Sequence, residues 1–122
     1  MLHMKTKIST PFWRACQSFY QELLGMHVLE AWDHPDDKGV ILGFGAAPHT
    51  ACLELYAADA NTDQAPPMVG IQFKVQDLKA FLSTVPKHIT FEGPKDRPWG
   101  ATYAYFKDPA GIDVVVFDGP TY

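Results

Sequence analysis

The chain has 122 residues, of which 47% are hydrophobic and 20% are charged, and its formal net charge is -4. This length and composition predict one compact globular domain, 1–122, and exclude a largely disordered chain. The chain lacks the block of basic residues that would indicate a nucleic-acid-binding protein. It also lacks the long apolar run of a membrane protein and the apolar core of a signal peptide, so a cytoplasmic location is expected. Cys16 and Cys52 are too few and too far apart to indicate a disulfide framework or a zinc site.

The first half of the chain predicts the order strand, helix, strand, strand, strand. Residues 3–9 alternate as in a half-buried strand. One face is expected to carry Met4, Thr6 and Ile8, and the other carries the polar side chains His3, Lys5, Lys7 and Ser9. Thr10 and Pro11 favour the start of a helix, and Gly25 favours its end. The apolar face of this helix is expected to contain Phe12, Cys16, Phe19, Tyr20, Leu23 and Leu24. Three further strands are expected at 26–32, 39–44 and 51–57, with a polar turn at 34–38.

The second half of the chain predicts the same order again. Residues 59–67 are polar and end in two prolines, so they are expected to link a first module, 1–58, to a second module, 68–122. In the second module a strand is expected at 68–75 and a short strand at 88–91. Between them Asp77 favours the start of a helix that ends before Pro86 and has the apolar face Leu78, Phe81, Leu82 and Val85.

The last hairpin has a specific turn signal. Tyr103–Phe106 is rich in aromatic residues and Ile112–Phe117 in branched residues, and both compositions are typical of strands. The segment between them, Asp108–Gly111, reads Asp-Pro-Ala-Gly. Asp accepts hydrogen bonds from the backbone ahead of it, Pro fixes its own φ, and Gly accepts a φ that other residues resist. These properties predict a tight turn between two antiparallel strands.

The hairpin, with Pro98-Trp99-Gly100 before it, resembles the last hairpin of the vicinal oxygen chelate superfamily of glyoxalases, bleomycin-resistance proteins and extradiol dioxygenases. Residues 19–26 resemble the family's phrase at the end of its first helix, and the resemblance runs from about residue 5 to residue 118. It implies an α+β fold in which two βαβββ modules form an eight-stranded open cup with the helices outside. It also implies a site in the concavity and a homodimer.

The metal enzymes of this superfamily place His or Glu at four inward-facing positions around a divalent ion, which polarises two substrate oxygens. By the resemblance, these positions fall here on Lys5, Glu54, Gly70 and Val115. Lys5 is a cation, Gly70 has no side chain and Val115 has no donor atom. The chain also lacks a phosphate-binding loop and a dinucleotide fingerprint. No metal and no other cofactor is therefore expected.

Candidate ligand-binding residues remain on the predicted strand faces and in the loops. Glu54 needs a partner for its charge, and Lys5 is the nearest candidate. The two residues recognise a polar ligand, or they form a structural ion pair, or Glu54 is an exposed surface residue. Trp32 and Trp99 either stack on a flat ligand or pack at a sheet edge or between subunits. Arg97 is either an anion contact or a solvated loop residue. The polar and aromatic side chains expected to complete a site for a small organic ligand are Tyr56, Gln72, Tyr103 and Asp113.

These residues are compatible with three functions. The first is a metal-independent homodimer of the bleomycin-resistance type that sequesters a small, partly aromatic molecule such as an antibiotic, and the acidic balance is compatible with a cationic ligand. The second is a lyase, isomerase or dioxygenase of the glyoxalase kind, with an atypical metal site built from Glu54, a histidine such as His3 and residues of a partner chain. The third is a partner-binding or regulatory module with a filled cup. The missing ligands favour the first.

Overall fold

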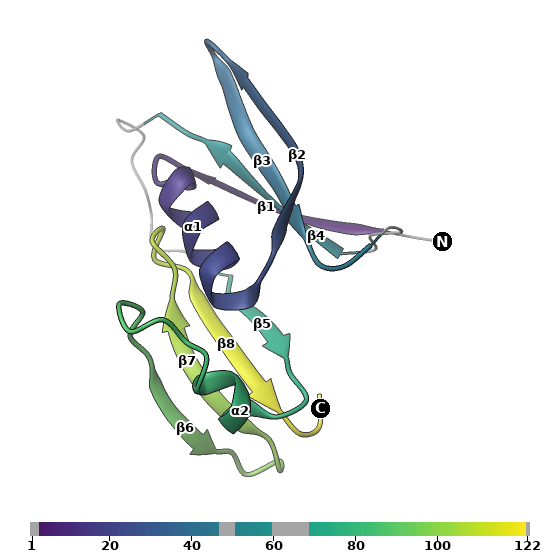
Figure 1. The fold of residues 1–122 in the computed structure, drawn as a ribbon, viewed down its shortest axis with the longest axis vertical. Coiled ribbons are helices and arrows are strands. Elements are labelled where there is room, and N and C mark those ends of the chain that lie inside the picture. The colour runs from purple at the N-terminus through teal and green to yellow at the C-terminus, as the bar shows by residue number, and fades with distance from the viewer. Residues whose placement is uncertain (1–2, 47–50, 60–68, 122) are drawn as a thin grey trace. The chain divides into compact units, whose positions relative to one another are not determined.

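The computed structural model describes residues 3–46, 51–59 and 69–121, which belong to two compact units, 1–64 and 65–122 (Figure 1). Within these described residues, each unit contains one helix and one four-stranded sheet. The order strand, helix, strand, strand, strand occurs in both units, which confirms the predicted α+β class and the repeated βαβββ pattern. The predicted linker, 59–67, lies outside the described residues except for Asp59.

Unit 1 places α1 on one face of a mixed sheet. Its elements are β1 (Met4–Thr10), α1 (Trp13–Leu24), β2 (His27–His34), β3 (Asp37–Gly43) and β4 (Ala51–Ala57). The sheet order is β1-β4-β3-β2, with β1 parallel to β4 and the other pairs antiparallel. The helix packs against β1, β3 and β4. Its contact with the sheet buries an apolar core: Ile8, Cys16, Phe19, Tyr20, Leu23, Val40, Leu42, Leu53 and Leu55.

The two ends of α1 differ from each other in how well the sequence predicts them. Gly25 adopts the left-handed conformation with φ 68°, and its N–H bonds the Gln21 carbonyl, so the predicted end is confirmed. The predicted start is wrong. Thr10 belongs to β1, and its hydroxyl accepts a hydrogen bond from the Phe12 N–H at 3.1 Å, which forms a turn before the helix. Phe12 is therefore 57% exposed, and Trp13 takes the buried position.

The β2–β3 hairpin is longer than predicted. Only residues 35–36 form the turn, whereas 34–38 were expected to do so. Asp33 pairs with Lys38 across the strands, and their side chains form an ion pair at 3.5 Å. Polar residues thus continue both strands, because cross-strand pairs of opposite charge are favourable. As a result, Asp37 lies in β3.

Unit 2 repeats this topology with a much shorter helix. Its elements are β5 (Ile71–Lys74), α2 (Leu78–Leu82), β6 (Glu92–Asp96), β7 (Thr102–Lys107) and β8 (Asp113–Asp118). The sheet order is β5-β8-β7-β6, with β5 parallel to β8. Asp77 accepts a hydrogen bond from the Ala80 N–H at 3.1 Å, as expected for a helix cap. Because α2 packs on β7 and β8, Val114 and Val116 are fully buried.

The predicted strand at 88–91 is wrong, and the strand that pairs with β7 is β6. Residues 87–89 form a turn in which the Ile89 N–H bonds the Pro86 carbonyl. β6 contains Pro94 and no apolar run, a composition that argues against a central strand. It lies at the edge of the sheet, where a residue without an N–H is tolerated. A β-bulge between Glu92 and Lys95 accommodates the proline.

The predicted β7–β8 hairpin is confirmed. Asp108 is buried, and its Oδ1 accepts hydrogen bonds from the N–H groups of Ala110 and Ile112, both at 2.9 Å. Gly111 has φ 87°, as the turn requires. Across the described part of the chain, no helix has the length and apolar character needed to span a membrane.

Candidate functional site

The sheet face of unit 1 opposite α1 carries a connected group of charged and aromatic side chains. We call this group the polar face: Lys5, Lys7, Trp32, Asp37, Glu54 and Tyr56. Lys5 Nζ lies 2.6 Å from Glu54 Oε1, so the ion pair predicted from the sequence is present. Lys7 Nζ lies 3.8 Å from Glu54 Oε2. Glu54 is only 7% exposed, and its carboxylate is occupied by two lysine side chains.

Asp37 connects the two aromatic residues of the polar face. Its Oδ1 accepts a hydrogen bond from Trp32 Nε1 at 2.9 Å, and its side chain also bonds the Tyr56 hydroxyl. Lys7 Nζ lies 4.3 Å from the centre of the Tyr56 ring, a cation–π contact. The Trp32 ring lies over Gly39, its register partner on β3. The lack of a side chain at Gly39 makes room for the ring, because a Cβ on Gly39 would lie 2.5 Å from it. Trp32 is therefore held by its own hairpin.

These contacts raise two pKa values on the polar face. The hydrogen bond that Lys5 donates to Glu54 and the negative charge of Glu54 raise the pKa of Lys5 above the ordinary value of 10.5. The hydrogen bond to Asp37 and the negative charge of Asp37 raise the pKa of Tyr56 above the ordinary value of 10.0. Because both groups bind their protons more tightly when folded, both stabilise the fold below these values. That stabilisation is lost as the pH rises through the folded-state pKa values.

Alkaline titration tests the Tyr56 contact. We expect the Tyr56→Phe variant to lose one phenol that ionises above pH 10.0 in the wild type, because phenolate formation beside Asp37 is unfavourable. The measurement is phenolate absorbance as a function of pH. The matched control is Asp37→Asn, in which all phenols remain and the same one should ionise at lower pH. If Tyr56→Phe instead removes a phenol that ionises at the ordinary pH for tyrosine, the contact with Asp37 is contradicted.

The sheet face of unit 2 opposite α2 is mostly aromatic. We call this group the aromatic cluster: Trp99, Tyr103, Tyr105, Val115 and Phe117. Tyr103 is at its centre, with its ring centroid 5.5 Å from those of Trp99 and Phe117 and 5.9 Å from that of Tyr105. Val115 and Phe117 are buried beneath it, whereas Trp99 is 46% exposed. The cluster thus has a packed base and rings that remain open to solvent.

The β6–β7 loop positions the exposed ring of the cluster. The Arg97 N–H bonds the Ala101 carbonyl at 2.8 Å, and the Gly100 N–H bonds the Arg97 carbonyl at 3.0 Å. Gly100 has φ 94°, so a glycine is favoured there. This tight loop brings Trp99 back over Tyr103 in an edge-to-face contact. It also places the Arg97 guanidinium 5.1 Å from the centre of the Trp99 ring.

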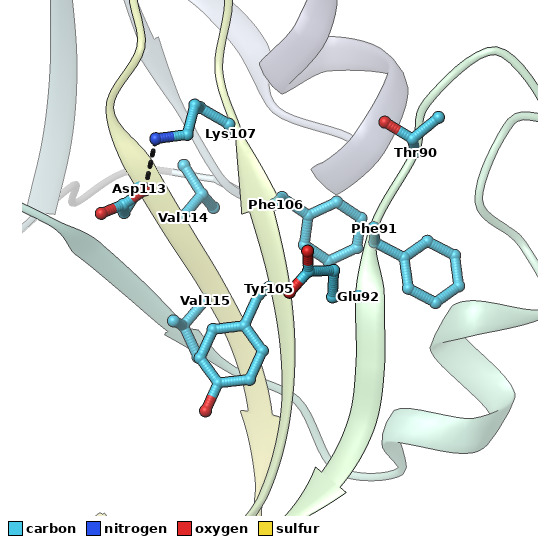
Figure 2. Close-up of a pocket in the computed structure, with 9 residues that line it drawn as sticks. All are labelled: Thr90, Phe91, Glu92, Tyr105, Phe106, Lys107, Asp113, Val114 and Val115. Carbon is cyan, nitrogen blue, oxygen red and sulfur yellow. Dashed lines mark ion pairs between the residues drawn. The ribbon is translucent and has the colours of Figure 1, made fainter.

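An open cavity of about 610 Å³ adjoins the aromatic cluster (Figure 2). Tyr105 and Val115, which are register partners, lie side by side in its wall. Glu92 is the register partner of Tyr105 on β6 and supplies a carboxylate. Lys107 and Asp113 form an ion pair at 3.0 Å in the same wall. The cavity therefore combines apolar surface with charged groups.

The residues at the family's four metal positions do not fit a divalent ion. In unit 1 Lys5 is a cation bonded to Glu54, and in unit 2 Val115 is part of the aromatic cluster. Within 3–46, 51–59 and 69–121, no three or more His, Cys, Asp or Glu side chains are grouped closely enough to hold a metal. His3, the histidine considered for an atypical metal site, belongs to no such group.

The structure divides the residues predicted from the sequence between the two faces. Lys5, Trp32, Glu54 and Tyr56 lie together on the polar face. On unit 2, Tyr103 donates a hydrogen bond to Gln72 at 3.4 Å and contacts Trp99, whereas Asp113 pairs with Lys107. Sequence reasoning missed Lys7, Asp37 and Tyr105 as site residues. The alternation of strand residues could have found Lys7 from Lys5 and Tyr105 from Tyr103, but the misplaced turn hid Asp37.

Comparisons with known proteins identify the same fold. Residues 14–116 match the model of the Glyoxalase/Bleomycin resistance protein/Dioxygenase superfamily. Lactoylglutathione lyase from Agrobacterium tumefaciens has 24% identity and a TM-score of 0.68, with 95% of this chain and 92% of that chain covered. TnmS3, an antibiotic binding protein from Streptomyces sp. CB03234, has 20% identity and a TM-score of 0.67, with 98% of both chains covered. UcmS2 has 20% identity and a TM-score of 0.77, again with 98% of both covered. No curated protein sequence matches the chain significantly.

Proposed function

The chain belongs to the glyoxalase/bleomycin resistance protein/dioxygenase superfamily, and from this premise we propose that it binds a small, partly aromatic molecule without a metal. The observation that carries the proposal is the aromatic cluster of unit 2. By the family resemblance, Val115 stands where the enzymes have their last metal ligand, and here it packs in one cluster with Phe117, Tyr103 and Tyr105. Trp99 extends this cluster through its contact with Tyr103. An apolar base with exposed rings suits stacking rather than oxygen chelation.

The polar face supports the metal-independent reading. Glu54 is the sole conventional donor among the four family positions, and two lysine side chains occupy its carboxylate. A divalent ion would have to displace Lys5 from a contact of 2.6 Å and would still lie beside two positive charges. Without Lewis-acid chemistry, sequestration of the ligand is the simplest activity. One protein of the same fold is described as antibiotic binding, which favours an antibiotic or another natural product as the ligand.

A homodimer in the cytoplasm is part of the proposal. Large apolar side chains are exposed on both units, including Met4 at 72% and Val69 at 63%. Exposed apolar side chains of this size are typical of interfaces between subunits when they are contiguous. Sedimentation equilibrium distinguishes the dimer from a monomer of 13.6 kDa.

A neutral probe tests the aromatic cluster as a binding surface. We expect 2-naphthamide to bind saturably and to shift the Trp99 indole resonance in an NMR titration of isotope-labelled protein. Trp99→Ala should weaken binding about fivefold to tenfold, since a stacked ring contributes roughly 1–1.5 kcal/mol. The control is Phe12→Ala, which removes a ring that is even more exposed, 57% against 46% for Trp99, from the start of α1 and should leave the dissociation constant unchanged. Equal effects of both substitutions, or one tightly held divalent ion per chain, would contradict the proposal.

A further inference from the structure

Three cationic side chains surround the aromatic cluster. Lys74 and Lys95 are the register partners of Phe117 and Tyr103, so they stand at the two ends of this row of rings. They lie on the outer strands of a four-stranded sheet, roughly 14 Å apart at about 4.8 Å per strand. Arg97 lies on the same side of the sheet as Lys95, with its guanidinium 5.1 Å from the centre of the Trp99 ring. Positive charge is therefore concentrated where β6 meets the exposed tryptophan.

These cations have no carboxylate partner within the described part of unit 2. Lys74 bonds only the Thr121 hydroxyl, at 3.5 Å, and Lys95 takes part in no ion pair. Arg97 Nε is buried and has no hydrogen-bond partner among the residues that the structure describes. A buried donor without a partner is unfavourable, and a charged one more so. Arg97 thus presents a desolvated donor beside an aromatic surface.

The carboxylates of this face do not balance its positive charge. Asp113 already pairs with Lys107 at 3.0 Å, so these two charges cancel each other. Glu92, the register partner of Tyr105, is the one acidic group of this face that forms no ion pair within residues 69–121. Three cations against one free carboxylate give the cluster a positive local charge, although the whole chain has a net charge of -4.

We propose that the aromatic cluster selects a planar aromatic molecule that carries an acidic group, such as a carboxylate or phenolate. The inference rests on the proposed binding function and specifies its ligand class. The ring of the ligand stacks on Trp99 and meets Tyr103 at its edge, because these two rings are 79° from parallel. Its anionic group accepts hydrogen bonds from Arg97, with Lys95 nearby. Arg is suited to this role because its rigid fork of N–H donors matches a carboxylate. The cation–π contact with Trp99 keeps this fork beside the aromatic surface.

A cationic ligand fits the same surface less well. Aromatic faces do attract cations, but Arg97 already occupies the Trp99 ring from one side. A second cation there would approach within a few ångströms of Arg97, well inside the screening length of about 10 Å in dilute salt. The balance of charges around the cluster therefore favours an acid over an amine of the same shape.

Three probes with the same ring system separate charge from shape: 2-naphthoate, 2-naphthamide and 2-naphthylmethylammonium. We expect wild-type protein in low-salt buffer to bind the acid at least about tenfold more tightly than the amine, with the amide between them. Arg97→Gln should weaken 2-naphthoate about tenfold and leave 2-naphthamide unchanged. Lys79→Gln, which removes a positive charge from α2 on the opposite side of the sheet, is the matched control and should change neither value.

The outcomes distinguish the two proposals from each other. Equal binding of all three probes would leave aromatic binding standing and would overturn the acid preference, as would tighter binding of the amine. Failure of all three probes to bind would overturn aromatic binding itself. If Arg97→Gln fails to fold, the comparison of probes on the wild type decides the question. Arg97→Lys, which keeps the charge and loses the fork, then tests the hydrogen-bond geometry through a partial loss of affinity for 2-naphthoate.

Discussion

Substitution of Gly93 by alanine is expected to lower the free energy of unfolding by roughly 3–5 kcal/mol, the largest effect on stability that we predict. Gly93 has φ 105°, which an L side chain rarely adopts. A Cβ at this position would also lie 2.7 Å from the Tyr103 carbonyl oxygen, a backbone atom that cannot rotate away. Strain and overlap therefore add at one residue of the β6 bulge. Urea unfolding followed by circular dichroism measures the loss.

Gly111 provides the matched control for this substitution. Its φ is 87°, but apart from Gly111 itself and its two chain neighbours no residue has an atom within 4 Å of the position that a Cβ would occupy. Gly111→Ala is therefore expected to lower the free energy of unfolding by about 1–2 kcal/mol, through the strained backbone conformation alone. The difference between the two variants isolates the contact with the Tyr103 carbonyl. Equal losses for the two variants would show that β6 is not held closely against β7 at the bulge.

Tyr103→Ala should have the largest effect on binding, a loss of affinity for 2-naphthamide of at least about thirtyfold, or roughly 2 kcal/mol. Tyr103 is the one ring of the cluster that contacts three others, Trp99, Tyr105 and Phe117. Its removal takes away a stacking surface and also leaves Trp99 without the ring against which it packs. An NMR titration of the variant measures the affinity, and its thermal unfolding shows whether the fold is retained.

Tyr103→Phe separates the ring from the hydroxyl. This variant keeps all three ring contacts and loses only the hydrogen bond to Gln72, which at 3.4 Å is long. We therefore expect its affinity for 2-naphthamide to stay within about twofold of the wild-type value, since a weak exposed hydrogen bond contributes little. If the phenylalanine variant binds as poorly as the alanine variant, then the hydroxyl and not the ring carries the interaction.

Local turn and cap chemistry explains why most of the fold is predictable from the sequence. Asp77, Asp108 and Gly25 act through atoms within a few residues, so their roles follow from residue type and spacing. The alternation of apolar residues likewise identifies the sheet face that each helix covers. The start of α1 was misplaced because Thr10 makes a local hydrogen bond that ends a strand instead of capping a helix.

The errors arise where tertiary context outweighs local preference. β6 contains a proline and charged residues, and only its place at the sheet edge makes such a strand acceptable. The Lys5–Glu54 pair could be predicted because the family resemblance assigns both residues to one site. The Trp32 position could not be predicted, since it depends on the space above Gly39 in the neighbouring strand. The positions of the charged side chains around Trp99 could not be predicted either. They depend on the register of β6, and the sequence predicted that strand at 88–91 instead.

The strand order of unit 2 determines when its sheet can form during synthesis. Among the described residues of unit 2, β5 pairs only with β8, and β8 is the last strand in the sequence. A nascent chain that has emerged as far as β7 therefore has β6 and β7 as a hairpin, but its β5 lacks any neighbouring strand. In unit 1 the strand equivalent to β8 is β4, which pairs with β1 and is complete at Ala57. The sheet of unit 1 can therefore form much earlier. Units of a chain generally fold in the order in which they are synthesised. The polar face of unit 1 is therefore expected to form before the aromatic cluster, which includes residues of β8.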